Sequence, residues 1–329
     1  MGYIAVIGAG SWGTTLANLL GEKGHDVFLW AYEQELVDEM KGTGMNGTYL
    51  PGLPLSHNIV VTSDLGKALS KASYILNAVP TQFTRSVFST AKNLLSEKSV
   101  IISASKGIEK GTLLTVSSIL EELTGSEVAA LSGPSFAKEV IKQLPTAVTV
   151  AAHDNKTALV LQDVFNTDTF RVYTNSDVLG VELGGALKNV MAIASGISDG
   201  LGLGASTRAA LITRGLAEMT RLGVAMGARE KTFGGLSGLG DLVLTCTGAL
   251  SRNYTVGFQL GSGRTLTDIL GEMKMVAEGV ATSQSAYELS KKHGVEMPIV
   301  EQINHVINEG KKPDQAVKEL MSRSLKAEF

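Results

Sequence analysis

The chain has 329 residues, and 29 lysines and arginines against 32 aspartates and glutamates give it a formal net charge of −3. Such a balance provides no basic surface for nucleic acid or an anionic membrane, so we expect neither partner. The five histidines are scattered without the spacing of metal ligands, so we expect no metal either. The length exceeds the usual size of one hydrophobic core, which predicts two domains.

The cellular compartment is indicated by the cysteine content and by the start of the chain. Cys246 is the only cysteine, so the chain forms no internal disulfide, which fits a reducing compartment. An apolar strand follows Met1 directly and leaves no room for a signal peptide. No run of about 18 apolar residues predicts a membrane span. We therefore expect a soluble cytoplasmic protein.

Residues 4–17 join a short apolar run to a segment typical of a helix. Gly8, Gly10 and Gly13 form the pattern Gly-x-Gly-x-x-Gly at the join. In a dinucleotide-binding turn, the first glycine permits the tight bend and the second admits the pyrophosphate. The third lets the helix pack closely on the strand, and the free N–H groups of the helix face the phosphates. An ordinary strand–helix turn is the alternative, but the position after an apolar strand favours the dinucleotide site.

The first half of the chain alternates between strand and helix patterns, which predicts a doubly wound parallel sheet. Beyond the first strand, further strands are expected at residues 26–30, 59–62, 74–79, 100–103, 128–131, 147–151 and 170–173. Helices are expected at residues 12–23, 33–41, 64–71, 81–95, 112–123 and 155–166. Residues 42–57 hold four glycines and two prolines and predict a loop.

The pattern changes after residue 176. Long helices rich in small residues are expected at 178–199 and 206–226, and no convincing strand follows. The fold class is therefore α/β, with a Rossmann-type dinucleotide-binding domain at 1–176 and an all-helical substrate and catalytic domain at 177–329.

Ligands of open parallel sheets bind beyond the carboxyl ends of the strands. Beyond the second strand, an acidic residue commonly binds the ribose hydroxyls of NAD, and an arginine the 2′-phosphate of NADP. This chain has Tyr32 and Glu33 there. Glu33 fits a ribose partner and a first-turn helix residue equally well, so the preference between the two cofactors stays open.

Two loops at the same edge of the sheet carry groups suited to an anion. Lys106 lies beside a glycine after the strand at 100–103, and residues 132–137 start a helix after the next strand. Each also has a plain structural interpretation. A single loop lysine is usually solvated, and position alone makes residues 132–137 a simple helix cap.

Lys188 is the only charged residue within 183–198. Buried lysines are rare unless paired, and a buried amine is a common proton donor. A lysine that reaches solvent from the edge of a core helix explains the sequence equally well. Downstream, a glycine-rich segment leads to Asp241. A helix that begins there would place Asp241 and Thr245 on one face, although Asp241 also suits a helix cap.

Ser251, Arg252 and Asn253 then offer a guanidinium fork and an amide suited to phosphate oxygens. With this tripeptide, the chain resembles the bacterial NAD(P)-dependent glycerol-3-phosphate dehydrogenases over nearly its whole length. The segments that carry the resemblance have the order and spacing of that family, and they are residues 8–14, 105–107, 132–135, 182–183 with 187–189, 238–242 and 251–253.

The resemblance implies reversible reduction of dihydroxyacetone phosphate to sn-glycerol 3-phosphate by a homodimer that uses NADP or NAD and feeds glycerophospholipid synthesis. It implies that Lys188 is the catalytic acid and base, oriented by Asp241, with Asn189 and Thr245 as neighbours. The implied substrate-binding residues are Lys106, Gly133, Ser135, Lys188, Asp241, Ser251, Arg252 and Asn253. The cofactor-binding residues are Gly8, Gly10, Ser11, Trp12, Gly13, Tyr32, Lys106, Ala137, Arg252, Val276 and Glu278.

The chain departs from the family at two tyrosines. At or beside the position of Tyr32, relatives often carry an arginine that would bind the NADP 2′-phosphate. Tyr32 has no charge, so we expect the chain to use both cofactors. Tyr254 stands where many relatives have a second arginine. Two other functions stay open, a β-hydroxyacid dehydrogenase acting on carboxylates and a non-catalytic NADPH-binding sensor. Arg252 and its neighbours favour the phosphate substrate.

Overall fold

The structure is a computed structural model that describes residues 2–96, 99–273, 275–325 and 327–328. The chain forms two compact units. The first contains Met1–Gly107 and Leu114–Glu182, and the second contains Ile108–Leu113 and Leu183–Phe329. Along this part of the chain the division thus falls after Glu182, whereas the sequence predicts a boundary at residue 176.

One sheet of eight strands organises the first unit, in the order β3-β2-β1-β4-β5-β6-β7-β8. All the expected strands are present, with small shifts at their ends. They are β1 (Tyr3–Ile7), β2 (Val27–Trp30), β3 (Ile59–Thr62), β4 (Ala72–Asn77), β5 (Val100–Ser103), β6 (Val128–Ser132), β7 (Thr146–Ala151) and β8 (Phe170–Asn175).

The expectation of a wholly parallel sheet is wrong at one pair. β6 and β7 run antiparallel, with Ser132 opposite Thr149, whereas the other neighbouring strands are parallel. A parallel connection needs a crossover of about a dozen residues or more, usually a helix long enough to return along the strand. The link between β6 and β7 contains the four-residue helix α6 (Ala137–Val140), which is too short for that return. The chain therefore turns back beside β6.

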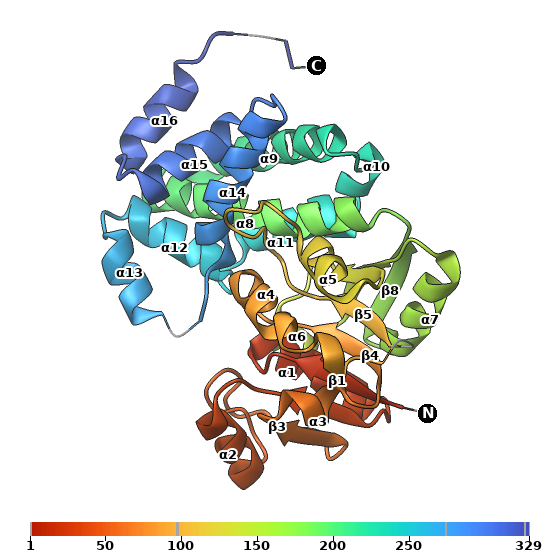
Figure 1. The fold of residues 1–329 in the computed structure, drawn as a ribbon. Helices are drawn as coiled ribbons and strands as arrows, with labels where there is room; N and C mark the ends of the chain where they lie inside the picture. Colours follow the sequence, from red (N-terminus) through yellow and green to blue (C-terminus); the bar gives the residue numbers. More distant parts are fainter. Residues whose placement is uncertain (1, 97–98, 274, 326, 329) are drawn as a thin grey trace. The chain divides into compact units, whose positions relative to one another are not determined.

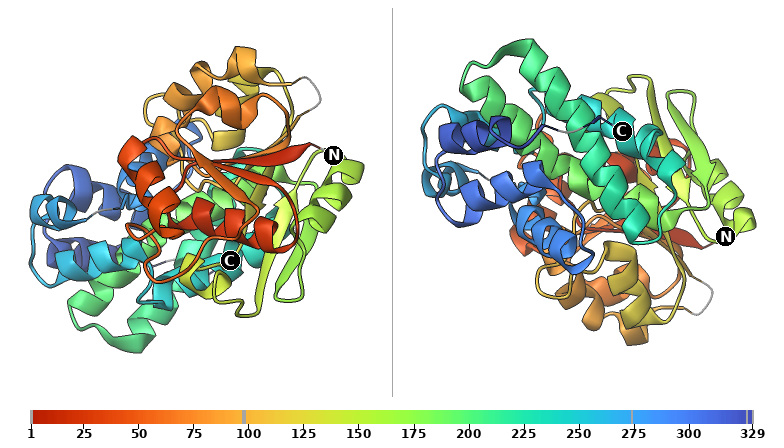
Figure 2. Two further views of the ribbon diagram at one scale, coloured as in Figure 1. Left: turned by 90° about the horizontal axis from the view of Figure 1, so that it is seen from below. Right: turned by 90° about the horizontal axis from the view of Figure 1, so that it is seen from above.

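Helices cover both faces of this sheet (Figures 1 and 2). One face packs against α1 (Ser11–Glu22), α2 (Gln34–Thr43) and α7 (Asn155–Phe165). The other packs against α3 (Leu65–Leu69), α4 (Thr81–Ser89) and α5 (Val116–Thr124). The helix expected over 81–95 is shorter, because α4 ends at Ser89 and the 3-10 turn η1 (Lys92–Leu94) follows.

The second unit is helical, and its described residues form no strand. Its elements are α8 (Val178–Gly200), which begins in the first unit, α9 (Gly204–Ala225), α10 (Glu230–Phe233), η2 (Leu236–Gly240), α11 (Asp241–Thr247), α12 (Arg252–Gly261), α13 (Leu266–Glu272), α14 (Glu278–Lys292), α15 (Pro298–Asn308) and α16 (Pro313–Met321). Helix α8 is long and apolar enough to cross a membrane, but 94% of its apolar window is buried inside the fold. That burial is what a core helix shows.

Helices α8 and α12 meet backbone to backbone. A Cβ placed on Gly257 of α12 would lie 2.1 Å from the carbonyl oxygen of Ile193 in α8. A Cβ placed on Gly196 of α8 would lie 2.1 Å from the carbonyl oxygen of Tyr254 in α12. No side-chain carbon fits at such distances, so only glycine permits this contact. The contact fixes the start of α12 against the middle of α8.

The segment Ile108–Leu113 follows β5 in the chain yet belongs to the second unit. The Ser285 hydroxyl of α14 donates hydrogen bonds to the carbonyl oxygens of Ile108 and Glu109 at 3.3 and 3.4 Å. Ile108 is fully buried. The second unit is therefore assembled from two separate stretches of chain.

Two buried glutamates cap the starts of helices elsewhere in the chain. Glu182 accepts hydrogen bonds from the N–H and the hydroxyl of Ser117, at the start of α5. Glu218 of α9 accepts from the N–H groups of Ile299 and Val300, at the start of α15, at 2.9 and 3.2 Å. Both carboxyl groups thus satisfy helix N–H groups that have no partner within their own helix.

Burial raises the pKa of Glu218 to about 7, against its ordinary value of 4.5, although the Ile299 and Val300 N–H groups and the charges of Arg221 and Arg214 oppose the rise. The folded state then holds a proton that the unfolded state loses, so stability falls as pH rises from about 4.5 through about 7. The full pKa difference corresponds to about 3 kcal/mol. We expect urea unfolding of Glu218→Gln to lose this component of the pH dependence. An identical decline in the variant and the wild-type protein would contradict the assignment.

Candidate functional site

The glycine turn of the first unit has the geometry of a dinucleotide site. Gly8 has a φ of +112°, and a Cβ there would lie 2.8 Å from the Ala78 carbonyl. A Cβ on Gly13 would lie 1.9 Å from the Gly8 oxygen. A Cβ on Gly10 would meet nothing within 4 Å, so the second glycine faces open space where a pyrophosphate could approach. Helix α1 begins just beyond, and Gly10 supplies no side-chain cap to its N–H groups.

Other residues expected to bind the cofactor lie around this turn. Ser11 begins α1, and the carbonyl of Ala137 at the start of α6 accepts from the Thr15 hydroxyl at 3.3 Å. Trp12 packs against the core, and its indole N–H is buried with no hydrogen-bond partner among the described residues. These positions fit a bound dinucleotide, whose phosphates would face the first turn of α1.

Asn46 supports the same turn, and the sequence analysis missed it. The residue is fully buried, and its side-chain N–H groups donate to the Ala9 carbonyl at 2.9 Å and to the Thr14 hydroxyl at 2.8 Å. It lies in the loop at 42–57, where a lone asparagine among glycines carries no motif. The only available signal was a polar residue inside a loop that follows the second helix.

The end of β2 presents Tyr32 and Glu33. The Tyr32 side chain is 78% exposed, with its ring edge-on to Trp30 at a centroid distance of 6.3 Å. Glu33 is the N-cap residue of α2, so it precedes the first turn of the helix. Its side chain makes no cap hydrogen bond. The sheet edge therefore carries a carboxylate and a neutral phenol at the position where cofactor riboses bind.

Three residues expected to bind substrate meet at the carboxyl end of β5 and β6. The Lys106 ammonium and the Ser135 hydroxyl both donate to the Gly133 carbonyl, each at 3.0 Å. Gly133 has a φ of +147°, and a Cβ there would lie 2.9 Å from Val148 Cα, so a side chain is excluded. The first unit thus holds an ammonium and a hydroxyl side by side, as an anionic ligand requires.

Lys188 lies buried in α8 and is paired. Its ammonium donates to Asp241 Oδ1 at 2.7 Å and to the Thr245 hydroxyl at 2.8 Å. The Lys188 side chain is 9% exposed and that of Asp241 only 1%, so the alternative of a lysine reaching solvent is wrong. Helix α11 begins at Asp241 and places Thr245 one turn later on the same face, as the sequence predicts. A buried ammonium between a carboxylate and a hydroxyl is a group able to give up and regain a proton.

Cys246 follows Thr245 but takes no part in this arrangement. Burial raises the pKa of its thiol to about 12. The thiol is therefore neutral at physiological pH and is no nucleophile. Its carbonyl oxygen instead accepts from the Ser195 hydroxyl of α8 at 2.8 Å.

The start of α12 gathers residues expected to bind substrate and cofactor. Ser251 caps the helix by accepting from the Tyr254 N–H at 3.2 Å. Arg252 Nη1 donates to the Val276 carbonyl at 2.7 Å, and Asn253 Oδ1 accepts from the N–H of Gly279, the residue after Glu278. The segment 276–279 and the tripeptide at 251–253 are therefore joined by hydrogen bonds within the second unit.

Tyr254 is engaged elsewhere in the same unit. Its hydroxyl donates to Asp199 Oδ2 at 2.7 Å, and Arg208 donates to the same oxygen at 2.6 Å. Tyr254 thus belongs to a polar cluster between α8, α9 and α12. Arg252 is left as the guanidinium of this tripeptide.

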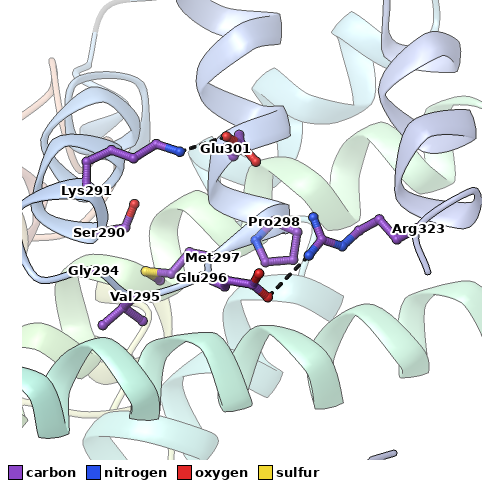
Figure 3. A pocket seen from close by; sticks show the side chains of 9 residues that line it. All are labelled: Ser290, Lys291, Gly294, Val295, Glu296, Met297, Pro298, Glu301 and Arg323. Carbon is purple, nitrogen blue, oxygen red and sulfur yellow. Dashed lines mark hydrogen bonds and ion pairs between the residues drawn. The ribbon is translucent and has the colours of Figure 1, made fainter. Parts of the chain in front are cut away.

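A separate cavity of about 270 Å³ lies in the second unit (Figure 3). Its ionic side chains are paired, since Lys291 bonds to Glu301 at 3.0 Å and Arg323 to Glu296 at 3.3 Å. None of the residues expected to bind substrate or cofactor lines it. The remaining lining residues are Ser290, Gly294, Val295, Met297 and Pro298. Among the residues that the structure describes, no three His, Cys, Asp or Glu side chains gather to hold a metal ion.

Comparison with known proteins gives consistent matches over both units. The family model described as NAD-dependent glycerol-3-phosphate dehydrogenase N-terminus matches residues 3–158, and the corresponding C-terminus model matches residues 177–318. The glycerol-3-phosphate dehydrogenase (NAD(P)+) of Citrifermentans bemidjiense is 61% identical, over 99% of this chain and 98% of that protein. The protein of the same name from Geobacter sulfurreducens is 57% identical, over 99% and 98%. A crystal structure of glycerol-3-phosphate dehydrogenase from Coxiella burnetii superposes with a TM-score of 0.95 at 42% identity, covering 98% of this chain and 99% of that one.

Proposed function

The chain belongs to the NAD(P)-dependent glycerol-3-phosphate dehydrogenase family. We propose that Lys188 supplies the proton when the enzyme reduces dihydroxyacetone phosphate to glycerol 3-phosphate. The nicotinamide of bound NADH or NADPH supplies the hydride to the carbonyl carbon. The Lys188 ammonium gives its proton to the carbonyl oxygen, which completes the alcohol. The observation that carries this proposal is the buried pairing of Lys188 with Asp241 and Thr245.

The neutral amine left after proton transfer keeps the same two neighbours. Asp241 and Thr245 hold Lys188 Nζ in place, and the ammonium is restored by a proton from solvent. In the oxidation of glycerol 3-phosphate the amine accepts the hydroxyl proton instead. Asp241 thus acts by orienting Lys188 and by stabilising its charged form, as a buried counter-ion does.

The remaining residues divide by the group they would bind. The residues proposed to bind the substrate are Lys106, Gly133, Ser135, Lys188, Asp241, Ser251, Arg252 and Asn253. The residues proposed to bind the cofactor are Gly8, Gly10, Ser11, Trp12, Gly13, Tyr32, Lys106, Ala137, Arg252, Val276 and Glu278. The ammonium of Lys106 and the guanidinium of Arg252 would supply positive charge for the substrate phosphate and the developing alkoxide. On this assignment residues 1–176 serve mainly the cofactor and residues 177–329 supply the acid.

The setting of the reaction follows from the same resemblance. We infer that the enzyme is a cytoplasmic homodimer and that its product supplies glycerophospholipid synthesis. The near-neutral charge of the chain supports a small-molecule substrate rather than a nucleic-acid partner.

The proposal is tested by following nicotinamide absorbance with dihydroxyacetone phosphate, in parallel with NADH and NADPH. Oxidation of either cofactor with formation of glycerol 3-phosphate supports the reaction, and its loss in Lys188→Ala with cofactor binding intact supports Lys188 as the proton donor. Turnover of a 3-hydroxy acid, with none of dihydroxyacetone phosphate, would assign the chain to the hydroxyacid dehydrogenases. Tight cofactor binding without turnover of either substrate would indicate a sensor.

Cofactor preference is expected to respond to Tyr32. An arginine at the end of β2 would place positive charge where the 2′-phosphate of NADP lies, and a charge-assisted bond of this kind contributes about 1.5–3 kcal/mol. We therefore expect Tyr32→Arg to raise the ratio of kcat/KM for NADPH over NADH about tenfold or more. Because Tyr32 is 78% exposed, the variant should fold as the wild-type protein does. Tyr32→Phe is the matched control, and an unchanged ratio in Tyr32→Arg would place the adenosine end elsewhere.

A further inference from the structure

Helix α14 begins without a cap of its own. Its N-cap residue is Ala277, which has no side-chain acceptor. The first N–H groups of a helix need a partner from outside it. For Gly279 that partner is Asn253 Oδ1 of α12, at 2.9 Å, and Asn253 is 7% exposed. A side chain from another helix therefore caps α14.

This capping role fixes the orientation of the Asn253 amide. Since its oxygen faces the Gly279 N–H, its NH2 group must find an acceptor, and Asn189 Oδ1 lies 2.9 Å from it. Asn189 is 5% exposed and follows Lys188 directly in α8. An amide NH2 has two N–H donors, so one remains on Asn253 for a ligand such as a phosphate oxygen.

The backbone makes the same junction tight. A Cβ on Gly279 would lie 2.6 Å from the Asn189 carbonyl oxygen and 2.8 Å from Asn253 Oδ1. The start of α14 thus rests directly on α8 at Asn189. A second hydrogen bond, from Arg252 Nη1 to the Val276 carbonyl, ties the approach to α14 to the start of α12.

We propose that Asn189 is a positioning residue that holds the segment 276–279, through Asn253, in register with Lys188. The proposal rests on the function given above, in which Lys188 is the acid and Val276 and Glu278 bind the cofactor. Asn189 needs no contact with either ligand. It acts by presenting an oxygen to Asn253, so that Asn253 in turn presents its own oxygen to the start of α14.

The experiment compares Asn189→Ala, Asn253→Ala and the double variant, each without substrate. Fluorescence titration should show NADH binding to Asn189→Ala weakened about tenfold, the loss of roughly one net hydrogen bond. The double variant should bind no more weakly than Asn253→Ala, because both changes break one chain of contacts. In the cofactor-free enzyme, the amide hydrogens of residues 276–281 should exchange faster in both single variants.

Asn304→Ala is the matched control, since Asn304 is also buried and its Oδ1 also accepts from an asparagine NH2, that of Asn308 at 2.8 Å. Equal weakening of NADH binding in Asn304→Ala would overturn the proposal, because general destabilisation would then explain the effect. Additive effects of the two single variants, or unchanged exchange over 276–281, would also overturn it. A wild-type enzyme that binds NADH but does not reduce dihydroxyacetone phosphate would refute the proposed function. The binding and exchange results would then still decide the role of Asn189.

Discussion

The Lys188→Ala variant is expected to lower kcat for dihydroxyacetone phosphate reduction by about a hundredfold to ten-thousandfold, the usual contribution of a positioned general acid. The Lys188 side chain is buried, and its ammonium lies 2.7 Å from Asp241 Oδ1. NADH binding, measured by fluorescence titration, should stay close to the wild-type value, since the glycine turn of the first unit is unaltered. The measurement is single-turnover reduction at saturating cofactor.

The partner carboxylate provides a second variant with a different signature. Asp241→Asn keeps the size of the side chain but leaves the Lys188 ammonium without its counter-ion in a buried site. Breaking a buried pair on one side costs about 3–5 kcal/mol, so this variant should lose stability as well as activity. Lys188→Ala with unimpaired single-turnover reduction would rule out Lys188 as the proton donor, whatever the behaviour of Asp241→Asn.

The Gly257→Ala variant is expected to lose at least about 3 kcal/mol of stability, the upper part of the range for inserting atoms into a packed core. The added methyl group would lie 2.1 Å from the Ile193 carbonyl oxygen. That atom is backbone within α8, so it cannot rotate aside as a flexible side chain would. Separation of α8 from α12 is the remaining response, and urea unfolding with an unchanged m-value measures its cost.

Gly271→Ala in α13 is the control for this prediction. It makes the same chemical change within a helix, but a Cβ there would meet nothing within 4 Å. Without a clash, alanine should stabilise the helix by about 0.5–1 kcal/mol relative to glycine. Opposite signs for the two variants would confirm that packing between α8 and α12 decides the effect. Equal midpoints for Gly257→Ala and the wild-type protein would show that the two helices are not in backbone contact.

The elements of the first unit could be predicted because short apolar runs bounded by turn residues identify buried strands. The run at 100–103 corresponds to β5 without a shift. The direction of β7 could not be predicted in this way, because periodicity shows that a strand exists but not which way it runs. That direction depends on the link after Ser132, whose only helix has four residues and is too short to return along the strand.

The candidate site was predictable where a local pattern carries it, as at Gly8, Gly10 and Gly13. Burial of Lys188 was undecided from sequence, because its partner Asp241 lies 53 positions away and only the packing of α11 on α8 brings the two together. The contact of Asn189 with Asn253 spans 64 positions, and two single asparagines form no motif. Contacts of this kind are properties of the fold and not of any segment.

The path of the chain has a consequence for dividing this protein into fragments. A fragment beginning at Leu183 would contain every helix from α9 onward and most of α8, yet it would lack Ile108–Leu113. The Ser285 hydroxyl would then lose both of its acceptors, and the space filled by the fully buried Ile108 would open to water. Separate expression of the two units, divided within α8 between Glu182 and Leu183, would therefore expose part of the second unit's interior. A fragment that carries Ile108–Leu113 on a linker would restore the acceptors of Ser285 and the buried side chain of Ile108.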